Sequence, residues 1–140
     1  MKKLFRRTFY IFLFFGLAFF SFNPVQINAQ EVDRSVETHK LTVKKTGNKW
    51  KTFDKKKNVE KQPKVKRGDY VVWEADSSDV YFQFMDEKLF GTFNAFLKQG
   101  DTLRLEVGKK AKKGKNYYSA FIYNDKAYLE GSSPPQIVVD

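Results

Sequence analysis

Short alternating stretches of apolar and polar residues make up most of this chain, and no stretch sustains a helical period over about ten residues. Successive side chains of a β-strand point to opposite faces of the sheet, so this alternation is typical of half-buried strands. It is clearest at 36–43, 80–85 and 102–107. Turn residues separate such stretches at intervals of roughly 8 to 12, which predicts seven or eight strands in an all-β, Greek-key antiparallel β-sandwich.

The remaining segments complete the predicted order of elements. Strands are expected at 35–43, 70–74, 80–85, 102–107, 117–123, 128–129 and 136–139, with a short aromatic segment at 50–53 and a loop at 55–58. A run from Val59 is interrupted by Pro63, which is typical of an edge strand or a bulge. Phe90, Phe93 and Phe96 follow at three-residue spacing, which fits a short helical turn or a loop pinned to the sandwich by its phenyl rings.

Residues 1–29 are predicted to be a secretory signal peptide. Basic residues near the start precede an apolar core at 9–20, which is too short to span a bilayer comfortably. We expect cleavage after Ala29, and an uncleaved membrane anchor is the alternative. Residues 30–34 are then a flexible leader and 35–140 a single sandwich domain. The mature protein is expected to be secreted or periplasmic, in the cell envelope, with no stable membrane span.

Composition restricts both the partners and the chemistry. Four of the 26 basic residues and none of the 16 acidic ones fall within 1–29, so cleavage lowers the net charge from +10 to about +6. Much of the basic character therefore belongs to the targeting segment. The aromatic residues alternate as core residues do, so nucleic acid is not an expected partner. Without a single cysteine, the domain must depend on its aromatic and aliphatic core rather than on disulfides.

Two stretches resemble the cupredoxins, the family of blue-copper sandwiches. Residues 65–73, Val-Lys-Arg-Gly-Asp-Tyr-Val-Val-Trp, resemble that family's Val-x-x-Gly-Asp-x-Val-x-Trp stretch, and residues 114–120 resemble its Gly-x-Tyr-x-Tyr-x-Cys strand. The resemblance covers most of the predicted domain and implies a cupredoxin-like sandwich, although similar Gly-Asp turns occur in immunoglobulin-like domains. Tyr81 stands at the position that the resemblance assigns to the first copper histidine, and Ala120 at that of the cysteine. It therefore implies the frame without the copper site.

No metal or other cofactor is predicted from the residues present. A blue-copper site needs a thiolate, two imidazoles and usually a thioether, whereas this chain has no cysteine and one histidine, His39. We interpret His39 as a sheet histidine near an edge. To ligate a metal it would need partners from other segments, such as Met85, Asp76 or Asp79.

Catalysis is not predicted either. The acidic residues at 76–79 and 86–87 lack the alternate spacing of a calcium loop, and nothing in the sequence supplies the apolar cleft that a glycosidase pair would need. The serines lack a Gly-x-Ser-x-Gly elbow, and His39 would be the only possible base of a triad. We interpret the acidic residues as turn and surface groups and the protein as a non-enzyme.

The remaining candidates are surfaces for binding. Five lysines in one predicted loop form a candidate anion-binding patch: Lys109, Lys110, Lys112, Lys113 and Lys115. Lys55, Lys56 and Lys57 would join it if both loops share an end of the sandwich; solubility is the alternative role. The main hypothesis is a non-enzymatic binding or structural module, with an anionic glycan, lipid headgroups or an envelope protein as partner. The alternative is a protein that binds carbohydrate or a small ligand on exposed aromatic residues, for example Tyr117, Tyr123, Tyr128 or Trp50.

Overall fold

The computed structural model describes residues 34–130 and 134–140, so the predicted signal peptide lies outside the described residues, as does most of the leader. The described residues belong to one compact unit. Its strands are β1 (Thr38–Thr46), β2 (Lys49–Asp54), β3 (Lys64–Val65), β4 (Tyr70–Ala75), β5 (Val80–Phe84), β6 (Asn94–Leu97), β7 (Thr102–Glu106), β8 (Gly114–Ile122), β9 (Ala127–Tyr128) and β10 (Gln136–Val139). A 3-10 helix, η1 (Glu87–Leu89), is the helical element among them, and no helix within the described ranges has the length and apolar character that a membrane crossing requires.

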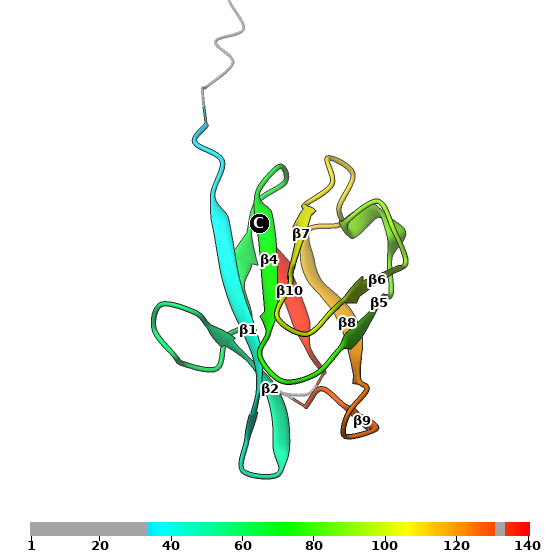
Figure 1. Cartoon of the computed structure of the whole chain (residues 1–140). Coiled ribbons are helices and arrows are strands. Elements are labelled where there is room, and N and C mark those ends of the chain that lie inside the picture. The colour runs from blue at the N-terminus through cyan, green and yellow to red at the C-terminus, as the bar shows by residue number, and fades with distance from the viewer. Residues whose placement is uncertain (1–33, 131–133) are drawn as a thin grey trace, which may run out of the picture. The chain divides into compact units, whose positions relative to one another are not determined.

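The strands form two sheets that face each other (Figure 1). One has the order β2-β1-β4-β7 and the other the order β3-β10-β8-β5-β6, with β9 paired to β8. The predicted all-β sandwich is confirmed, but the prediction that its sheets are wholly antiparallel is wrong, because β1 pairs with β4 and β3 with β10 in parallel. Parallel neighbours need a crossover connection, and between β1 and β4 the chain passes through β3 of the opposite sheet. The run interrupted by Pro63 becomes β3, a short edge strand as predicted.

Trp73 lies at the centre of the core between the two sheets. It belongs to β4 and is fully buried. Its ring centroid lies 5.2 Å from that of Phe82 and 6.3 Å from those of Phe84 and Tyr118, all on the opposite sheet. Phe90, just after η1, meets it edge-on at 5.6 Å. One indole therefore joins the two sheets and the loop that closes one end of the sandwich.

Burial along the strands follows the alternation seen in the sequence. On β5, Val80, Phe82 and Phe84 are buried, while Tyr81 and Gln83 point outward and are exposed. The same period holds along all nine residues of β8. Strand periodicity therefore gives each of these two strands a core-facing side and an outward side.

Two segments differ from their predicted form. Residues 49–54, predicted only as a short aromatic segment, form the full strand β2. The helical turn near the three phenylalanines is η1, which ends just before Phe90, and Phe90 alone of the three is buried. Phe93 and Phe96 are 55% and 47% exposed and do not pin a loop to the core. Phe96 points outward because it lies on the outer side of β6, whereas Leu97, the next residue of the strand, is buried.

Gly108 allows the loop after β7 to pack directly against η1. Its N–H donates a 2.8 Å hydrogen bond to the carbonyl of Leu89. A Cβ atom built on Gly108 would lie 2.4 Å from the carbonyl oxygen of Lys88, which is far inside van der Waals contact. Glycine is the residue that tolerates so close an approach between two backbone segments.

We expect Trp73→Ala to reduce the free energy of unfolding by about 3 to 5 kcal/mol, because it leaves a cavity where both sheets meet. Chemical denaturation of the purified protein measures the loss. Trp73→Phe, which keeps one ring in the aromatic cluster, should cost clearly less. A loss below about 1 kcal/mol for the alanine variant would contradict the central position of this indole.

We expect Gly108→Ala to destabilise the protein by about 1 to 3 kcal/mol, because either the loop or η1 must move to relieve the clash. Thermal and chemical unfolding would detect it. Lys110→Ala, an exposed change in the same loop, serves as the control and should alter stability by no more than about 0.5 kcal/mol. Equal stability of the two variants would show that the close approach at Gly108 is unimportant.

Candidate functional site

One row of aromatic residues crosses the outer face of the six-stranded sheet. The strand registers place Phe96 of β6 opposite Tyr81 of β5, Tyr81 opposite Phe121 of β8, and Phe121 opposite Tyr128 of β9. All four side chains point away from the core. Neighbouring strands are about 4.8 Å apart, so the row extends over about 14 Å.

Tyr123, just after β8, joins this row through its ring contacts. Its centroid lies 5.8 Å from that of Phe96 and 5.4 Å from that of Phe121, and Phe121 lies 5.3 Å from Tyr128. These contacts are edge-to-face, which fixes the rings relative to one another. We call Tyr81, Phe96, Phe121, Tyr123 and Tyr128 the aromatic platform. Exposed fractions of 36% to 64% for four of its members make it a substantial apolar surface, of the kind that marks a binding site.

A row of polar side chains borders the platform on the same face. Asn94 lies opposite Gln83, and Gln83 lies opposite Ser119. Within 34–130 and 134–140, their side-chain amides and hydroxyl make no hydrogen bond. Gln83 and Ser119 also line a shallow hollow together with three platform residues, Tyr81, Phe121 and Tyr128. Unpaired amide groups beside exposed rings can donate to and accept from a polar ligand.

Of the four aromatic residues that the sequence suggested as ligand-binding, three are exposed in the structure and one is buried. Tyr123 and Tyr128 belong to the platform, and Tyr117 is exposed on the same outer face. Trp50, by contrast, is 4% exposed, and its Nε1 donates a 2.8 Å hydrogen bond to Asp125, so its prediction as an exposed binding residue is wrong. The core-facing position of Trp50 could not be read from the sequence because 49–54 was not predicted as a strand.

Sequence reasoning missed Phe96 and Phe121 as surface residues. Alternation on β8 would have placed Phe121 outward, on the same side as Tyr117 and Tyr123. The registers that set Tyr128 opposite Phe121, and Phe96 opposite Tyr81, depend on how the strands pair, and the alternation within one strand does not contain them.

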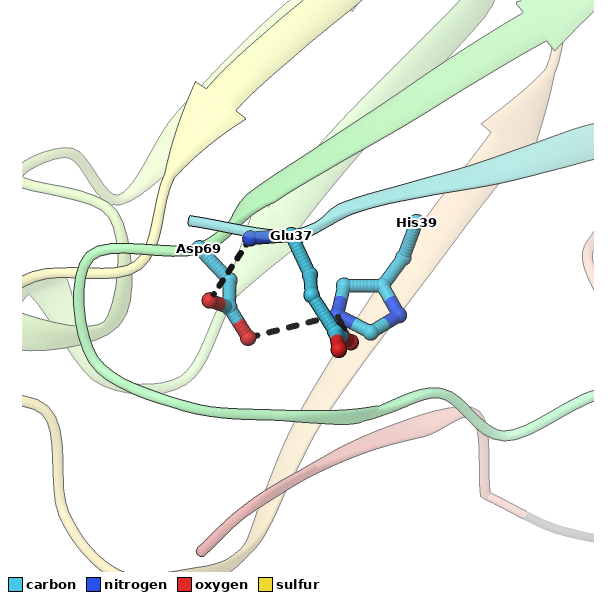
Figure 2. Close-up of side chains that lie close together, drawn as sticks. All are labelled: Glu37, His39 and Asp69. Atoms are coloured by element: carbon cyan, nitrogen blue, oxygen red, sulfur yellow. Dashed lines mark hydrogen bonds and ion pairs between the residues drawn. The ribbon is translucent and has the colours of Figure 1, made fainter. Parts of the chain in front are cut away.

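A second group of functional side chains surrounds His39 at the end of the four-stranded sheet. The Nε2 atom of His39 lies 3.3 Å from Oδ2 of Asp69 and 3.8 Å from Oε2 of Glu37 (Figure 2). These ligand atoms are close enough together to hold a metal ion. The partners of the histidine are therefore Glu37 and Asp69, rather than Met85, Asp76 or Asp79 as suggested from the sequence.

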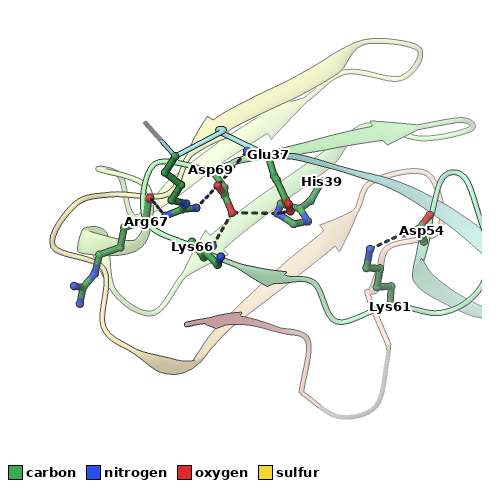
Figure 3. A network of polar contacts seen from close by, with 8 residues as sticks. Glu37, His39, Asp54, Lys61, Lys66, Arg67 and Asp69 are labelled. Carbon is green, nitrogen blue, oxygen red and sulfur yellow. Dashed lines mark hydrogen bonds and ion pairs between the residues drawn. The ribbon is translucent and has the colours of Figure 1, made fainter. Parts of the chain in front are cut away.

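Asp69 is already saturated with hydrogen-bond donors. Its Oδ2 accepts from the backbone N–H of Lys66 at 2.7 Å and from His39, and its Oδ1 accepts from the backbone N–H of Glu37 at 3.2 Å and from Arg34 at 2.5 Å (Figure 3). An ionised carboxylate has about four lone-pair sites, and all are used. A metal ion would have to displace these donors beside a guanidinium charge, so the group functions better as a structural latch between β1 and the turn before β4.

These contacts determine the ionisation of Asp69. Burial raises the pKa of its carboxyl, but the hydrogen bonds from Lys66, Glu37 and His39 and the charge of Arg34 outweigh burial and leave the pKa below its ordinary value.

Asp54, the last residue of β2, forms a similar anchor for the loop that follows (Figure 3). The hydrogen bond from Lys61 at 2.5 Å, together with the backbone N–H groups of Lys57 and Lys56, lowers its pKa to about 2. Lys55 in the same loop pairs with Glu74 at 2.5 Å. This lysine-rich loop is therefore tied to its own sheet by acidic partners.

The two lysine-rich loops leave the four-stranded sheet from opposite edges. The loop at 55–57 follows the edge strand β2, and the loop at 108–113 follows the edge strand β7. Figure 1 shows the former projecting from the side of the sandwich and the latter at its upper end. All five lysines of the candidate anion-binding patch are exposed: Lys109, Lys110, Lys112, Lys113 and Lys115. The two loops do not share an end of the sandwich, so the condition for joining 55–57 to the patch is not met, while anion binding by the five lysines stays a prediction.

The acidic residues of two turns have structural partners. Oδ1 of Asp79 accepts a 2.8 Å hydrogen bond from the backbone N–H of Gln99. Oδ1 of Asp86 accepts from the N–H of Lys88 at 2.9 Å and so caps η1. These are the contacts of turn residues, in line with the interpretation of these acids from the sequence.

The positions that the cupredoxin resemblance assigned to copper do not fit a copper site. Tyr81 is an exposed phenol on the outer face of one sheet, and Ala120 is a buried core residue. His39 belongs to the other sheet, where it contacts Asp69. No thiolate is available, and these positions do not converge, so the donor set of blue copper is not assembled here.

No protein-family model matches this chain, and no curated protein matches it. Among solved structures, it is similar to an amicyanin mutant in its reduced Cu(I) form at pH 4, with a TM-score of 0.38 and 15% sequence identity over 79% of this chain and 87% of the amicyanin chain. The fold described above rests on the strand order and registers rather than on this likeness.

We expect Asp69→Asn to destabilise the protein by about 1 to 3 kcal/mol at neutral pH, because it leaves buried donors poorly paired. A carboxyl whose pKa is lowered by folding stabilises the native state above its unfolded pKa, near 4, and this contribution is lost as the pH falls through the folded value. As the pH is lowered from 7 to 2, the free energy of unfolding should therefore fall less for Asp69→Asn than for the unchanged protein. Asp101→Asn, an exposed change, is the control; matching profiles for the two variants would contradict the latch.

Proposed function

We propose that this protein is a secreted or cell-envelope, non-enzymatic binding module that holds a carbohydrate on its aromatic platform. The observation that carries the proposal is the continuity of the platform: four ring-bearing residues on four neighbouring strands and a fifth just after β8, bordered by a row of side chains with unpaired amides and a hydroxyl.

Sugar rings are well matched to such a surface. Each has a face of C–H groups that packs against an aromatic ring, and a rim of hydroxyls that both donate and accept hydrogen bonds. The platform supplies the rings, while Asn94, Gln83 and Ser119 offer amide and hydroxyl groups along one side. The length of the row, about 14 Å, suits several units of a chain better than a single small molecule.

The shape of the site supports binding of an extended ligand. The hollow beside Tyr81 and Gln83 is shallow, and a second hollow adjoins it, sharing Ser119 and Tyr128 and reaching Pro135. Enclosed pockets suit small molecules. Shallow hollows placed end to end along a sheet face suit a polymer that lies across it.

The main alternative is that the platform binds a protein surface rather than a carbohydrate. An exposed aromatic surface also fits a second copy of the chain or an envelope protein. The unpaired polar row favours a hydroxylated ligand, because the centre of a protein interface would leave those amides buried without partners.

The test is affinity electrophoresis and calorimetry of the purified protein against a panel of soluble polysaccharides. We expect Tyr128→Ala and Phe96→Ala each to weaken binding about 3- to 10-fold without altering stability greatly, because each removes one stacking ring. Tyr70→Ala removes a tyrosine from the other sheet, where it stacks on Arg104, and should leave the affinity unchanged.

Two outcomes would contradict the proposal. Binding that is unaffected by either platform variant would place the carbohydrate elsewhere. A dimer in analytical ultracentrifugation that dissociates in the platform variants, with no polysaccharide bound, would make the platform an interface between copies.

A further inference from the structure

The five lysines of the candidate patch belong to a larger basic cluster. The guanidinium of Arg67, in the turn before β4, donates from Nε and Nη2 to the carbonyl of Ala111 at 3.0 and 2.8 Å, so that turn lies beside the loop after β7. The registers also place Val138 of β10 between Lys64 of β3 and Lys115 of β8. The basic cluster comprises eight exposed residues: Lys64, Lys66, Arg67, Lys109, Lys110, Lys112, Lys113 and Lys115.

These eight cations lie together without acidic partners among the described residues, whereas several lysines elsewhere on the domain have one. None of them forms an ion pair with a residue of 34–130 or 134–140. Five lysines on other parts of the surface do: Lys45 with Asp125, Lys49 with Glu130, Lys51 with Glu60, Lys55 with Glu74 and Lys61 with Asp54. Asp140, whose N–H donates to the carbonyl of Val65, and Glu87 are acidic residues at the border of the cluster, and neither pairs with it. Unpaired like charges gathered together repel one another and attract an anion.

The basic cluster and the aromatic platform share one continuous face. Along β8 the outward side chains are Lys115, Tyr117, Ser119 and Phe121 in turn. A strand advances about 3.4 Å per residue, so Lys115 lies about 20 Å from Phe121 on the same side of the same strand. Met85 and Tyr117 occupy the stretch between the polar row and the cluster.

We infer that the ligand of the platform is an anionic polysaccharide, which packs its sugar rings on the platform and continues along β8, so that its carboxylate or sulfate groups reach the basic cluster. This inference rests on the proposed function. It adds the charge of the ligand and the direction, along β8, in which the ligand continues from the platform. Lys115 and Lys64 are the cations nearest to the course of the polysaccharide along β8, because both point outward from strands of this sheet and flank Val138.

A polysaccharide fits these observations better than a lipid surface. A bilayer meeting the basic end of the sandwich would contact the loop at 108–113 and would leave the platform about 20 Å away unused. A flexible polyanion can contact both regions at once. Two linked contacts on one chain also gain from effective concentration, so modest interactions at each end suffice for binding.

The experiment compares two ligands with one backbone: polygalacturonate, and the same polymer after methyl esterification of its carboxyl groups. At low salt we expect the purified protein to bind the acidic polymer roughly tenfold more tightly than the ester, and added salt should reduce this preference. The double variant Lys64→Gln/Lys115→Gln should lose most of the preference while binding the ester as before. Lys40→Gln/Lys56→Gln removes the same charge from the other sheet and should retain it. Tyr128→Ala should weaken binding of both polymers.

The alternative outcomes separate this inference from the proposed function. Equal binding of both polymers, unaffected by Lys64→Gln/Lys115→Gln but weakened by Tyr128→Ala, would overturn the inference and leave carbohydrate binding intact. Binding of the acidic polymer that depends on the two lysines but not on Tyr128 would show that the polymer does not contact the platform, and would overturn this inference and the proposed site together. Binding to phosphatidylglycerol vesicles with the same lysine dependence, and to neither polymer, would overturn both in favour of a lipid surface.

Discussion

The packing of Trp73 between the two sheets is the interaction on which the rest of the structure depends. Its indole contacts Phe82 and Tyr118 of the opposite sheet and Phe90 after η1, so both sheets and the closing loop meet at one side chain. No disulfide reinforces this core, because the chain has no cysteine. A core that buries its aromatic residues so completely leaves the outer faces free to carry other chemistry.

The outer face of the six-stranded sheet combines three kinds of chemistry in successive rows. Rings lie toward one end, amides and a hydroxyl come next, and cations lie at the other end. The latch at Asp69 contributes indirectly, since it fixes the turn that carries Lys66 and Arg67 against the start of β1. A structural carboxylate on one sheet thus helps to position part of the basic cluster beside the other.

Local pattern predicted much of the fold. The alternation of Val80, Phe82 and Phe84 with Tyr81 and Gln83 identified a strand, its buried side and its exposed side. The parallel pairing of β1 with β4 could not be predicted in this way, because strand neighbours depend on crossovers rather than on periodicity.

The candidate site was predicted only in fragments, for the same reason. Tyr128 and the lysines at 109–115 were recognisable as surface residues, but their neighbours were not. Phe96 reaches Tyr81 only through the register of β6 on β5, and Arg67 reaches the lysine loop only through the carbonyl of Ala111. His39 meets Asp69 through the parallel pair of β1 and β4. Each of these contacts joins segments far apart in the sequence, and a single sequence without structure does not record them.

The position of β10 in its sheet also determines when the domain can fold. Residues 136–139 lie between β3 and β8, so the sheet remains split until β10 has been synthesised. Its parallel pairing with Lys64–Val65 closes a long loop, and such non-local contacts form slowly. Among the described strands, β3 pairs with β10 alone, so the sheet is complete only once this pairing has formed.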